Sequence, residues 1–245
     1  MGTNKTSSNK GWGRRGFLDW VTITLRFASI TALLLVIGSV IWAWTYRFAT
    51  PPGTLTMVER KLSGEAIKNA WTPMDEISSH LVTAVIAAED TKFCAHNGID
   101  FDAIDQAFEE AEHGKRLRGA STISQQTAKN AFLWNGGGWA RKSVEAWITY
   151  VIETLWPKRR IMEVYLNVAE WGDGIFGAEA AAQARFGKSA KALSKREAAL
   201  LASVLPNPHK WRVDPPGPYV RKRVRTVRAR MDVVKRDALD ACTLK

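Results

Sequence analysis

Residues 87–100, AAEDTKFCAHNGID, end an apolar run with two adjacent carboxylates, Glu89 and Asp90. The chain carries 35 Lys and Arg against 24 Asp and Glu, so paired acids at the end of an apolar segment stand out. Two interpretations are open at this point. The pair ends a helix that turns into a loop, or it supplies a catalytic acid in a nearly dry setting.

An apolar stripe leads up to Glu89. Ile77, Leu81 and Val85 recur at steps of four, and Glu89 is the next step, so its carboxylate is expected on the buried side of a helix. A Thr-Pro pair at 72–73 predicts the start of that helix. Burial raises the pKa of a carboxyl and makes it a usable proton acceptor near neutral pH. Spacing alone supports a structural acid equally well.

A second stretch, RGASTISQQTAKN at 118–130, predicts a loop that runs into a helix. Gln126, Lys129 and Asn130 are three and four residues apart and share one helix face. Two amides and an ammonium on one face suit an anion. A solvated polar face is the competing interpretation.

A third stretch, RKSVE at 141–145, places Arg141 four residues before Glu145, the spacing of an ordinary ion pair within a helix. Glu145 also continues an apolar stripe that runs on to Leu155, which predicts a second acid facing the core. Two half-buried acids beside a basic, amide-rich face outline a glycosyl-transfer site.

Taken together, these stretches resemble the peptidoglycan glycosyltransferase domain (glycosyltransferase family 51) of class A penicillin-binding proteins and monofunctional transglycosylases. The resemblance covers roughly residues 72–210, and the layout looks closest to the monofunctional biosynthetic enzymes. A transpeptidase domain would need S-x-x-K and K-T-G motifs. No K-T-G occurs, and the S-x-x-K at Ser7 lies in the N-terminal tail. The matching motifs, in order, are EDTKFCAHNGID, GASTISQQTAKN, RKSVE, RIMEVYLNVAEWGDGIFGAEAAAQ and EAALLASVLPNP.

The resemblance implies an all-α, lysozyme-like fold that polymerises lipid II into β-1,4-linked glycan with inversion and release of undecaprenyl pyrophosphate. It implies that Glu89 is the general base and that Glu145 is a second acid, assisting departure of the pyrophosphate. A divalent cation, Mg²⁺ or Mn²⁺, is expected to bind with the pyrophosphate, since no self-contained cluster of metal-ligating residues is apparent. Positions implied to bind substrate are Asp90, Phe93, His96, Ser121, Gln126, Lys129, Asn130 and Arg141.

Two positions depart from the pattern of the family. Relatives often carry an arginine in the loop before the third motif, where this chain has Gly136-Gly137-Gly138. A family tyrosine before Phe-Gly-Lys is Arg185 here, which leaves that aromatic contact in doubt. For His96, core packing or an orienting hydrogen bond is favoured over catalysis.

Composition adds further bounds. A net charge of +11 suits an anionic partner. The resemblance implies that the partners are lipid II, the growing glycan strand, the membrane and other cell-wall proteins, and not nucleic acid. Cys94 and Cys242 fit no zinc spacing, and the sequence does not decide between a bridge and two free thiols.

Residues 27–46 form an uncharged segment of 20 residues, about the thickness of a bilayer's hydrocarbon core. Its length and its bulky aromatic end favour an anchor over a cleaved signal peptide. The basic residues before it predict a cytoplasmic N-terminus and a periplasmic catalytic domain on the bacterial inner membrane. The predicted organisation is a cytoplasmic tail (1–26), an anchor (27–46), a juxtamembrane linker (47–71), the glycosyltransferase domain (72–215) and a basic C-terminal helix (216–245).

The last segment predicts a packed helix with an apolar stripe from Val220 to Val234 and arginines, Arg223 among them, on the opposite face. Strand signals are sparse, and TLTMV at 54–58 predicts at most one short strand. Two other functions compete with a lipid II polymerase. One is a lytic transglycosylase or muramidase-like hydrolase, which also uses two acids, and the other is a non-catalytic scaffold of the wall machinery.

Overall fold

A computed structural model of the chain describes residues 12–114 and 121–244. Residues 1–11 of the predicted cytoplasmic tail and residues 115–120, including the start of the second motif, lie outside the described residues. The chain divides into two units, residues 1–42 and 43–245. The described part consists of ten α-helices with three short strands, so the prediction of an all-α fold is confirmed.

Helix α1 (Trp12–Phe48) is long and apolar enough to cross a membrane, by its length and composition. Its 37 residues would extend about 55 Å. Within the apolar part, Phe17–Phe48, only 6% of the most apolar 18-residue window is buried. The predicted N-terminal apolar helix is confirmed, and it starts earlier than residue 27.

The last turn of α1 belongs to the globular unit. The Trp156 indole Nε1 donates to the Ala43 carbonyl at 2.8 Å. The Arg160 guanidinium donates to the Tyr46 carbonyl at 2.8 Å, and the Tyr46 ring lies 5.4 Å from that of Phe132. These contacts attach the end of the apolar helix to the rest of the globular unit.

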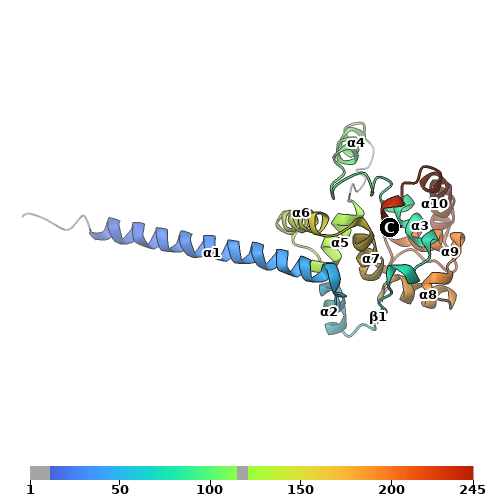
Figure 1. Cartoon of the computed structure of the whole chain (residues 1–245), viewed down its shortest axis with the longest axis horizontal. Helices are drawn as coiled ribbons and strands as arrows, with labels where there is room; N and C mark the ends of the chain where they lie inside the picture. The colour runs from blue at the N-terminus through green and yellow to red at the C-terminus, as the bar shows by residue number, and fades with distance from the viewer. Residues whose placement is uncertain (1–11, 115–120, 245) are drawn as a thin grey trace, which may run out of the picture. The chain divides into compact units, whose positions relative to one another are not determined.

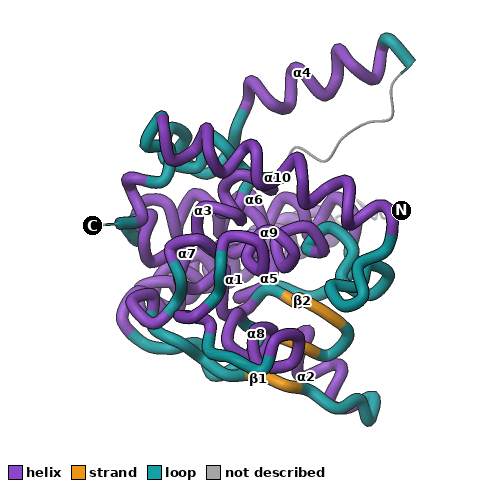
Figure 2. The backbone as a smooth tube through the Cα atoms, turned by 90° about the vertical axis from the view of Figure 1, so that its right-hand side faces the viewer, coloured by secondary structure: helices purple, strands orange, loops and turns teal. Residues whose placement is uncertain are grey.

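The globular unit is built from two groups of packed helices (Figures 1 and 2). One group contains α3 (Ser79–Glu89), α9 (Lys195–Val204) and α10 (Pro218–Arg236). In the other, α5 (Ile123–Phe132) packs on α6 (Gly138–Leu155) and on α7 (Lys158–Val168). The remaining helical elements are α2 (Leu55–Leu62), α4 (Phe101–Glu112), α8 (Ala178–Phe186) and the short 3-10 turns Met74–Glu76, Ala190–Ala192 and Ala241–Thr243.

A small sheet lies beside α8 (Figure 2). The strands are β1 (Lys68–Asn69), β2 (Glu170–Gly172) and β3 (Ile175–Phe176), in the order β1-β3-β2. β1 pairs parallel to β3 with Lys68 opposite Ile175, and β2 pairs antiparallel to β3.

Two local predictions are wrong. Residues 54–58 begin helix α2 and form no strand, because the Thr54 side chain caps the helix by accepting from the Met57 N–H at 3.1 Å. Helix α3 begins at Ser79, after extended Ile77, and not at the Thr-Pro pair. The Thr72 N–H instead donates to the Asn167 side chain at 2.8 Å, a partner that sequence spacing does not reveal.

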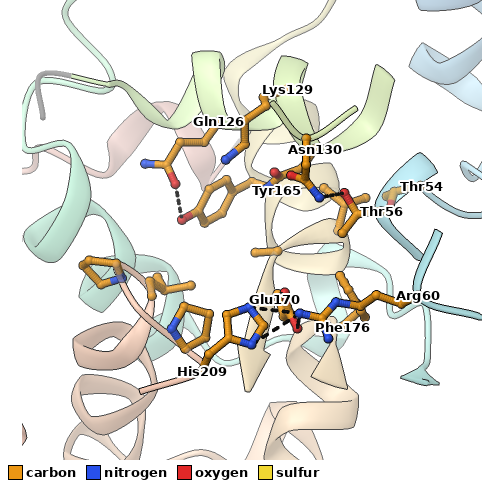
Figure 3. Close-up of a pocket in the computed structure, with 16 residues that line it drawn as sticks. Thr54, Thr56, Arg60, Gln126, Lys129, Asn130, Tyr165, Glu170, Phe176 and His209 are labelled. Carbon is orange, nitrogen blue, oxygen red and sulfur yellow. Dashed lines mark hydrogen bonds and ion pairs between the residues drawn. The ribbon is translucent and has the colours of Figure 1, made fainter. Parts of the chain in front are cut away.

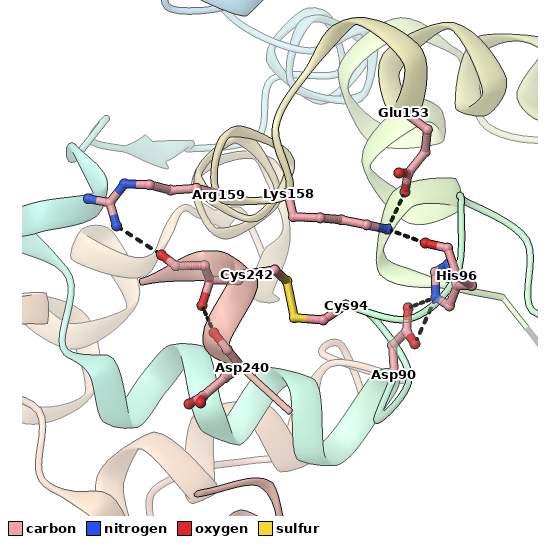
Figure 4. Close-up of a disulfide and its surroundings, with 9 residues drawn as sticks. Asp90, Cys94, His96, Glu153, Lys158, Arg159, Asp240 and Cys242 are labelled. Carbon is pink, nitrogen blue, oxygen red and sulfur yellow. Dashed lines mark hydrogen bonds and ion pairs between the residues drawn. A yellow bond between two sulfur atoms is a disulfide. The ribbon is translucent and has the colours of Figure 1, made fainter. Parts of the chain in front are cut away.

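The C-terminal segment folds back over α3 (Figure 4). Cys242 forms a disulfide with Cys94, 148 residues earlier. Buried Asp240 accepts from the Thr83 hydroxyl of α3 at 2.8 Å and pairs with Lys235 at 2.7 Å. The cysteine question is thereby settled in favour of a bridge.

Candidate active site

Glu89 is the last residue of α3, and its side chain is 12% exposed. The Gln126 amide of α5 donates to Oε2 of Glu89 at 3.2 Å. An Arg223 nitrogen of α10 lies 3.4 Å from Oε1, the distance of a charge contact. Three helices that are far apart in the sequence thus meet at this carboxylate.

Burial raises the pKa of Glu89 above the ordinary carboxyl value. The Gln126 hydrogen bond and the Arg223 charge oppose this rise, and the neighbouring Asp90 charge adds to it. A carboxyl with a raised pKa holds a transferred proton better, which is the property that a general base needs.

Tyr165 of α7 orients the amide that contacts Glu89. Its hydroxyl donates to Oε1 of Gln126 at 3.3 Å, which leaves the Gln126 NH₂ group to face the carboxylate. Tyr165 is buried, and burial raises the pKa of its phenol well above the usual 10.0. The phenol therefore stays protonated and keeps its donor.

Asp90 is placed as a structural link. Its carboxylate accepts from the backbone N–H of Ile123, at the start of α5, at 3.0 Å. It also accepts from Nε2 of His96 at 3.0 Å. Because the Gly98 N–H donates to Nδ1 of His96 at 3.1 Å, the ring proton belongs on Nε2. The geometry of His96 agrees with an orienting hydrogen bond.

The loop after Asp90 is held from several sides (Figure 4). The Lys158 ammonium donates to the His96 carbonyl at 2.7 Å and lies 4.6 Å from the centre of the Phe93 ring, which is fully buried. Gly98 has a φ of +97°, and a Cβ there would meet Thr149 at 2.8 Å. This close approach explains the glycine of the first motif.

Helix α5 is the central support of the site. Thr122 and Gln125 form a capping box at its start, beside exposed Ser121. From there, Gln126 reaches Glu89, and Lys129 lies one turn further along the helix. Burial lowers the pKa of Lys129, and the charge of Glu145 opposes that change.

Glu145 of α6 is buried and pairs directly with two cations, Arg141 and Lys142. Both interpretations of residues 141–145 are therefore correct: Arg141 and Glu145 form an ion pair within the helix, and Glu145 faces the core. Gln126 donates a hydrogen bond to Glu89, and the charge of Glu145 acts on Lys129. Both acids therefore interact with α5, on adjacent turns of the helix.

A pocket of about 360 Å³ opens beside α5 (Figure 3). Gln126, Lys129 and Asn130 lie along one side of it with Tyr165. The other side carries His209 and charged residues of α2 and β2. The other predicted site residues do not line it: Glu89, Asp90, Phe93, His96, Ser121, Arg141 and Glu145.

The glycine loop closes against Arg141. Gly137 caps α6 in the left-handed region at φ +81°, and Nε of Arg141 donates to the Gly136 carbonyl at 2.7 Å. A Cβ at Gly137 would meet Arg141 at 2.9 Å. Arg141 thus holds the glycine loop through a backbone carbonyl.

One group of side chains has a spacing that suits a metal ion. Ligand atoms of Glu170, Asp173 and His209 lie within 4.8 Å of one another. The Arg60 guanidinium already lies among them, 3.2 Å from Glu170 and 3.0 Å from Asp173. A fixed cation opposes a second one, so this group does not fit a divalent metal.

Sequence reasoning missed two residues at Glu89. Tyr165 lies inside the fourth matching motif, but no spacing rule points it at Gln126. Arg223 was assigned to the solvent face, which is wrong: it lies three residues after Val220 and four before Val227, both buried. That spacing, applied strictly, places Arg223 at the edge of the buried stripe.

Comparison with known proteins identifies the family of the chain. The Transglycosylase family profile matches residues 56–232. A biosynthetic peptidoglycan transglycosylase of Rhodospirillum centenum is 56% identical over 214 residues, covering 87% of this chain and 91% of the relative. The protein of the same name from Caulobacter vibrioides is 52% identical over 210 residues, covering 86% and 92%. A third, from Pseudomonas aeruginosa, is 50% identical over 200 residues, covering 79% and 86%. The matched profile spans more than half of the chain, and the three relatives align along most of their own length. The chain therefore belongs to the transglycosylase family.

Proposed function

We propose that this protein is a membrane-anchored peptidoglycan glycosyltransferase that polymerises lipid II into β-1,4-linked glycan strands. Family membership and the names of the relatives support the enzyme class. The observation that carries the residue assignment lies on α5. This helix contacts the largely buried Glu89 through Gln126 and carries Lys129, which interacts with Glu145 and its paired cations.

Glu89 acts as the general base in this proposal. It takes the proton from the 4-hydroxyl of the acceptor sugar while that oxygen attacks the anomeric carbon of the growing chain. The bond to the pyrophosphate breaks on the opposite side, so the configuration inverts and undecaprenyl pyrophosphate leaves with the electron pair. The raised pKa of Glu89 supports this role.

Lys129 and Arg141 stabilise the negative charge that develops on the departing pyrophosphate. Glu145 holds Arg141 and Lys142 in place for this task. Asp90, Phe93 and His96 keep the first-motif loop in position, and Gln126 and Asn130 present amides to the substrate. Ser121 contributes a hydroxyl at the start of α5.

A divalent cation, Mg²⁺ or Mn²⁺, enters the proposal as an ion carried chiefly by pyrophosphate oxygens. It would add positive charge next to the leaving group. The carboxylates described above are already occupied by arginine, lysine or amide partners, which supports binding through the substrate.

We place the enzyme in the bacterial inner membrane as a single-pass protein with a cytoplasmic N-terminus and a periplasmic catalytic unit. The apolar helix α1 and the basic residues before its uncharged part, 27–46, support this topology. The Cys94–Cys242 bridge supports it independently, because disulfides persist in oxidising compartments. Protease added to spheroplasts should degrade the catalytic unit, and protection from the protease would contradict this orientation.

The test is polymerisation of labelled lipid II by purified full-length protein in detergent with a divalent ion. Wild type should make long glycan, and Glu89→Gln should make almost none. Purified glycan serves as a second substrate: a lytic enzyme would fragment it, whereas the polymerase leaves it unchanged. If neither protein makes glycan while lipid II still binds, the non-catalytic scaffold is the better account.

A further inference from the structure

Arg223 is a basic residue of α10 that contacts the proposed base, Glu89. Helix α10 packs on α3, and Arg223 reaches from it to the C-terminal end of α3. One guanidinium nitrogen lies 3.4 Å from Oε1 of Glu89 and 3.5 Å from the Ala88 carbonyl. A cation at a helix C-terminus is favourable because the last carbonyls of the helix are unpaired and partly negative.

The burial of Arg223 points to a role beyond a surface charge. Its side chain is 26% exposed, and its Nε atom is buried without a hydrogen-bond partner among the described residues. Leaving a buried donor unpaired costs folding free energy. Unsatisfied buried donors in a folded protein call for an explanation, and a functional site is a common one.

The two oxygens of Glu89 have different neighbours. Gln126 donates to Oε2 from one side, and Arg223 faces Oε1 from the other. A carboxylate oxygen has two lone pairs, so each keeps room for a substrate hydroxyl. The pair of contacts fixes the plane of the carboxylate and leaves it able to accept a proton.

Burial disfavours the charged form of a carboxyl, so an opposite charge nearby helps a buried base to stay ionised and able to accept a proton. Of the groups that face Glu89, the Gln126 amide is neutral, the Tyr165 phenol is neutral, and Asp90 is negative. Arg223 supplies the opposing positive charge. Helix α9 also packs on α3, but its charged residues at its start, such as Lys195 and Glu197, pair with Asp232 and Lys188.

We propose that Arg223 is a positioning residue for the base: from α10 it orients the Glu89 carboxylate and keeps it ionised between turnovers. The inference rests on the proposed function, since it assigns a partner to the same base. It adds a residue outside the five matching motifs to the machinery of the reaction.

The test is the pH dependence of lipid II polymerisation by the full-length protein. We would measure kcat and kcat/KM from about pH 5 to about pH 9 for wild type, Arg223→Gln and Arg223→Lys. Arg225→Gln is the matched control, because Arg225 is exposed on the same helix one half-turn away. Thermal unfolding of each variant verifies that it is folded.

In Arg223→Gln the acidic limb of the profile should move up by about one pH unit, since the charge that favours the ionised form is lost. Below the limb, kcat/KM should then fall about tenfold, and the loss should shrink as the pH rises. Arg223→Lys should keep the limb close to that of wild type, and Arg225→Gln should match wild type throughout.

A loss by the same factor at every pH would overturn the proposal and make Arg223 a structural residue. An increase in KM with an unmoved limb would overturn it too, in favour of direct substrate binding. Failure of the proposed function looks different: wild type itself would then make no glycan.

Discussion

Glu89 and Glu145 are both largely buried carboxylates of the globular unit, yet their partners differ. Glu89 has an amide at 3.2 Å and a cation at 3.4 Å, so its charge is only partly compensated. Glu145 pairs directly with Arg141 and Lys142 from its own helix. Different partners therefore leave Glu89 suited to take up a proton and Glu145 suited to hold two cations in place.

This difference is sharpest when both acids are changed to glutamine. Glu89→Gln removes the proton acceptor, and we expect lipid II turnover to fall about 10²–10⁴-fold. Folding should be preserved, because the amide keeps the shape of the side chain and removes a partly compensated buried charge. Turnover with labelled lipid II and thermal unfolding measure the two effects, with Glu109→Gln on exposed α4 as the control. Turnover close to that of wild type in Glu89→Gln would contradict the assignment of Glu89 as the proton acceptor.

The surroundings of Glu89 also depend on the C-terminal segment, whereas those of Glu145 do not. Replacing Cys94 and Cys242 by serine should lower the free energy of unfolding by about 2–5 kcal/mol, because the bridge closes a loop of 148 residues. Turnover should fall as well, since Cys94 lies in the loop that carries His96 and follows Asp90.

Reduced wild type should behave like the double serine variant in denaturant titrations and in turnover. Unchanged stability and turnover after verified reduction would show that the C-terminal segment is held without the bridge.

Glu145→Gln should lower turnover, because Arg141 loses the acid that holds it, and it should lower stability more than Glu89→Gln does. It leaves two cations without their shared anion, and breaking such a group costs about 1–3 kcal/mol after allowing for the 40% exposure of Lys142. Urea unfolding of Glu145→Gln beside Glu89→Gln measures the contrast. If Glu89→Gln proves to be the less stable of the two variants, the cation partners of Glu145 do not give it the larger structural role.

The smallest expected effect is the pH dependence of stability. The pKa of Glu89 is raised in the folded state, so the ionised form costs folding free energy. The stability that Glu89 contributes is present below its unfolded pKa and is lost as the pH rises through the folded pKa.

Relative to Glu89→Gln, wild type should therefore lose stability from about pH 4.5 upward until the folded pKa is passed. Each unit by which the pKa is raised corresponds to about 1.4 kcal/mol. Unfolding titrations of both proteins at a series of pH values measure this difference. A difference that stays constant with pH, or changes in the opposite sense, would contradict the assignment of Glu89 as the less compensated acid.

Much of the site was accessible from local spacing. The steps of four that end at Glu89 and the stripe that includes Glu145 placed both acids toward the core, because helical periodicity depends on neighbouring residues alone. The spacing of Gln126 and Lys129 likewise put them on one face of α5. Predictions failed where a distant partner decided the outcome. The Thr72 N–H donates to the Asn167 side chain, and α3 starts later than the Thr-Pro pair suggests.

By itself, the sequence determined the helical class, the apolar N-terminal helix, the buried acids and the membership of a family of wall-building enzymes. These properties follow from periodicity, composition and motif order, which are all local along the chain. Only the tertiary structure decided that Cys94 pairs with Cys242, that Tyr165 orients Gln126 and that Arg223 faces Glu89. Each of these contacts joins residues on different elements. Their geometry is set by how helices pack, and no spacing within one segment encodes it.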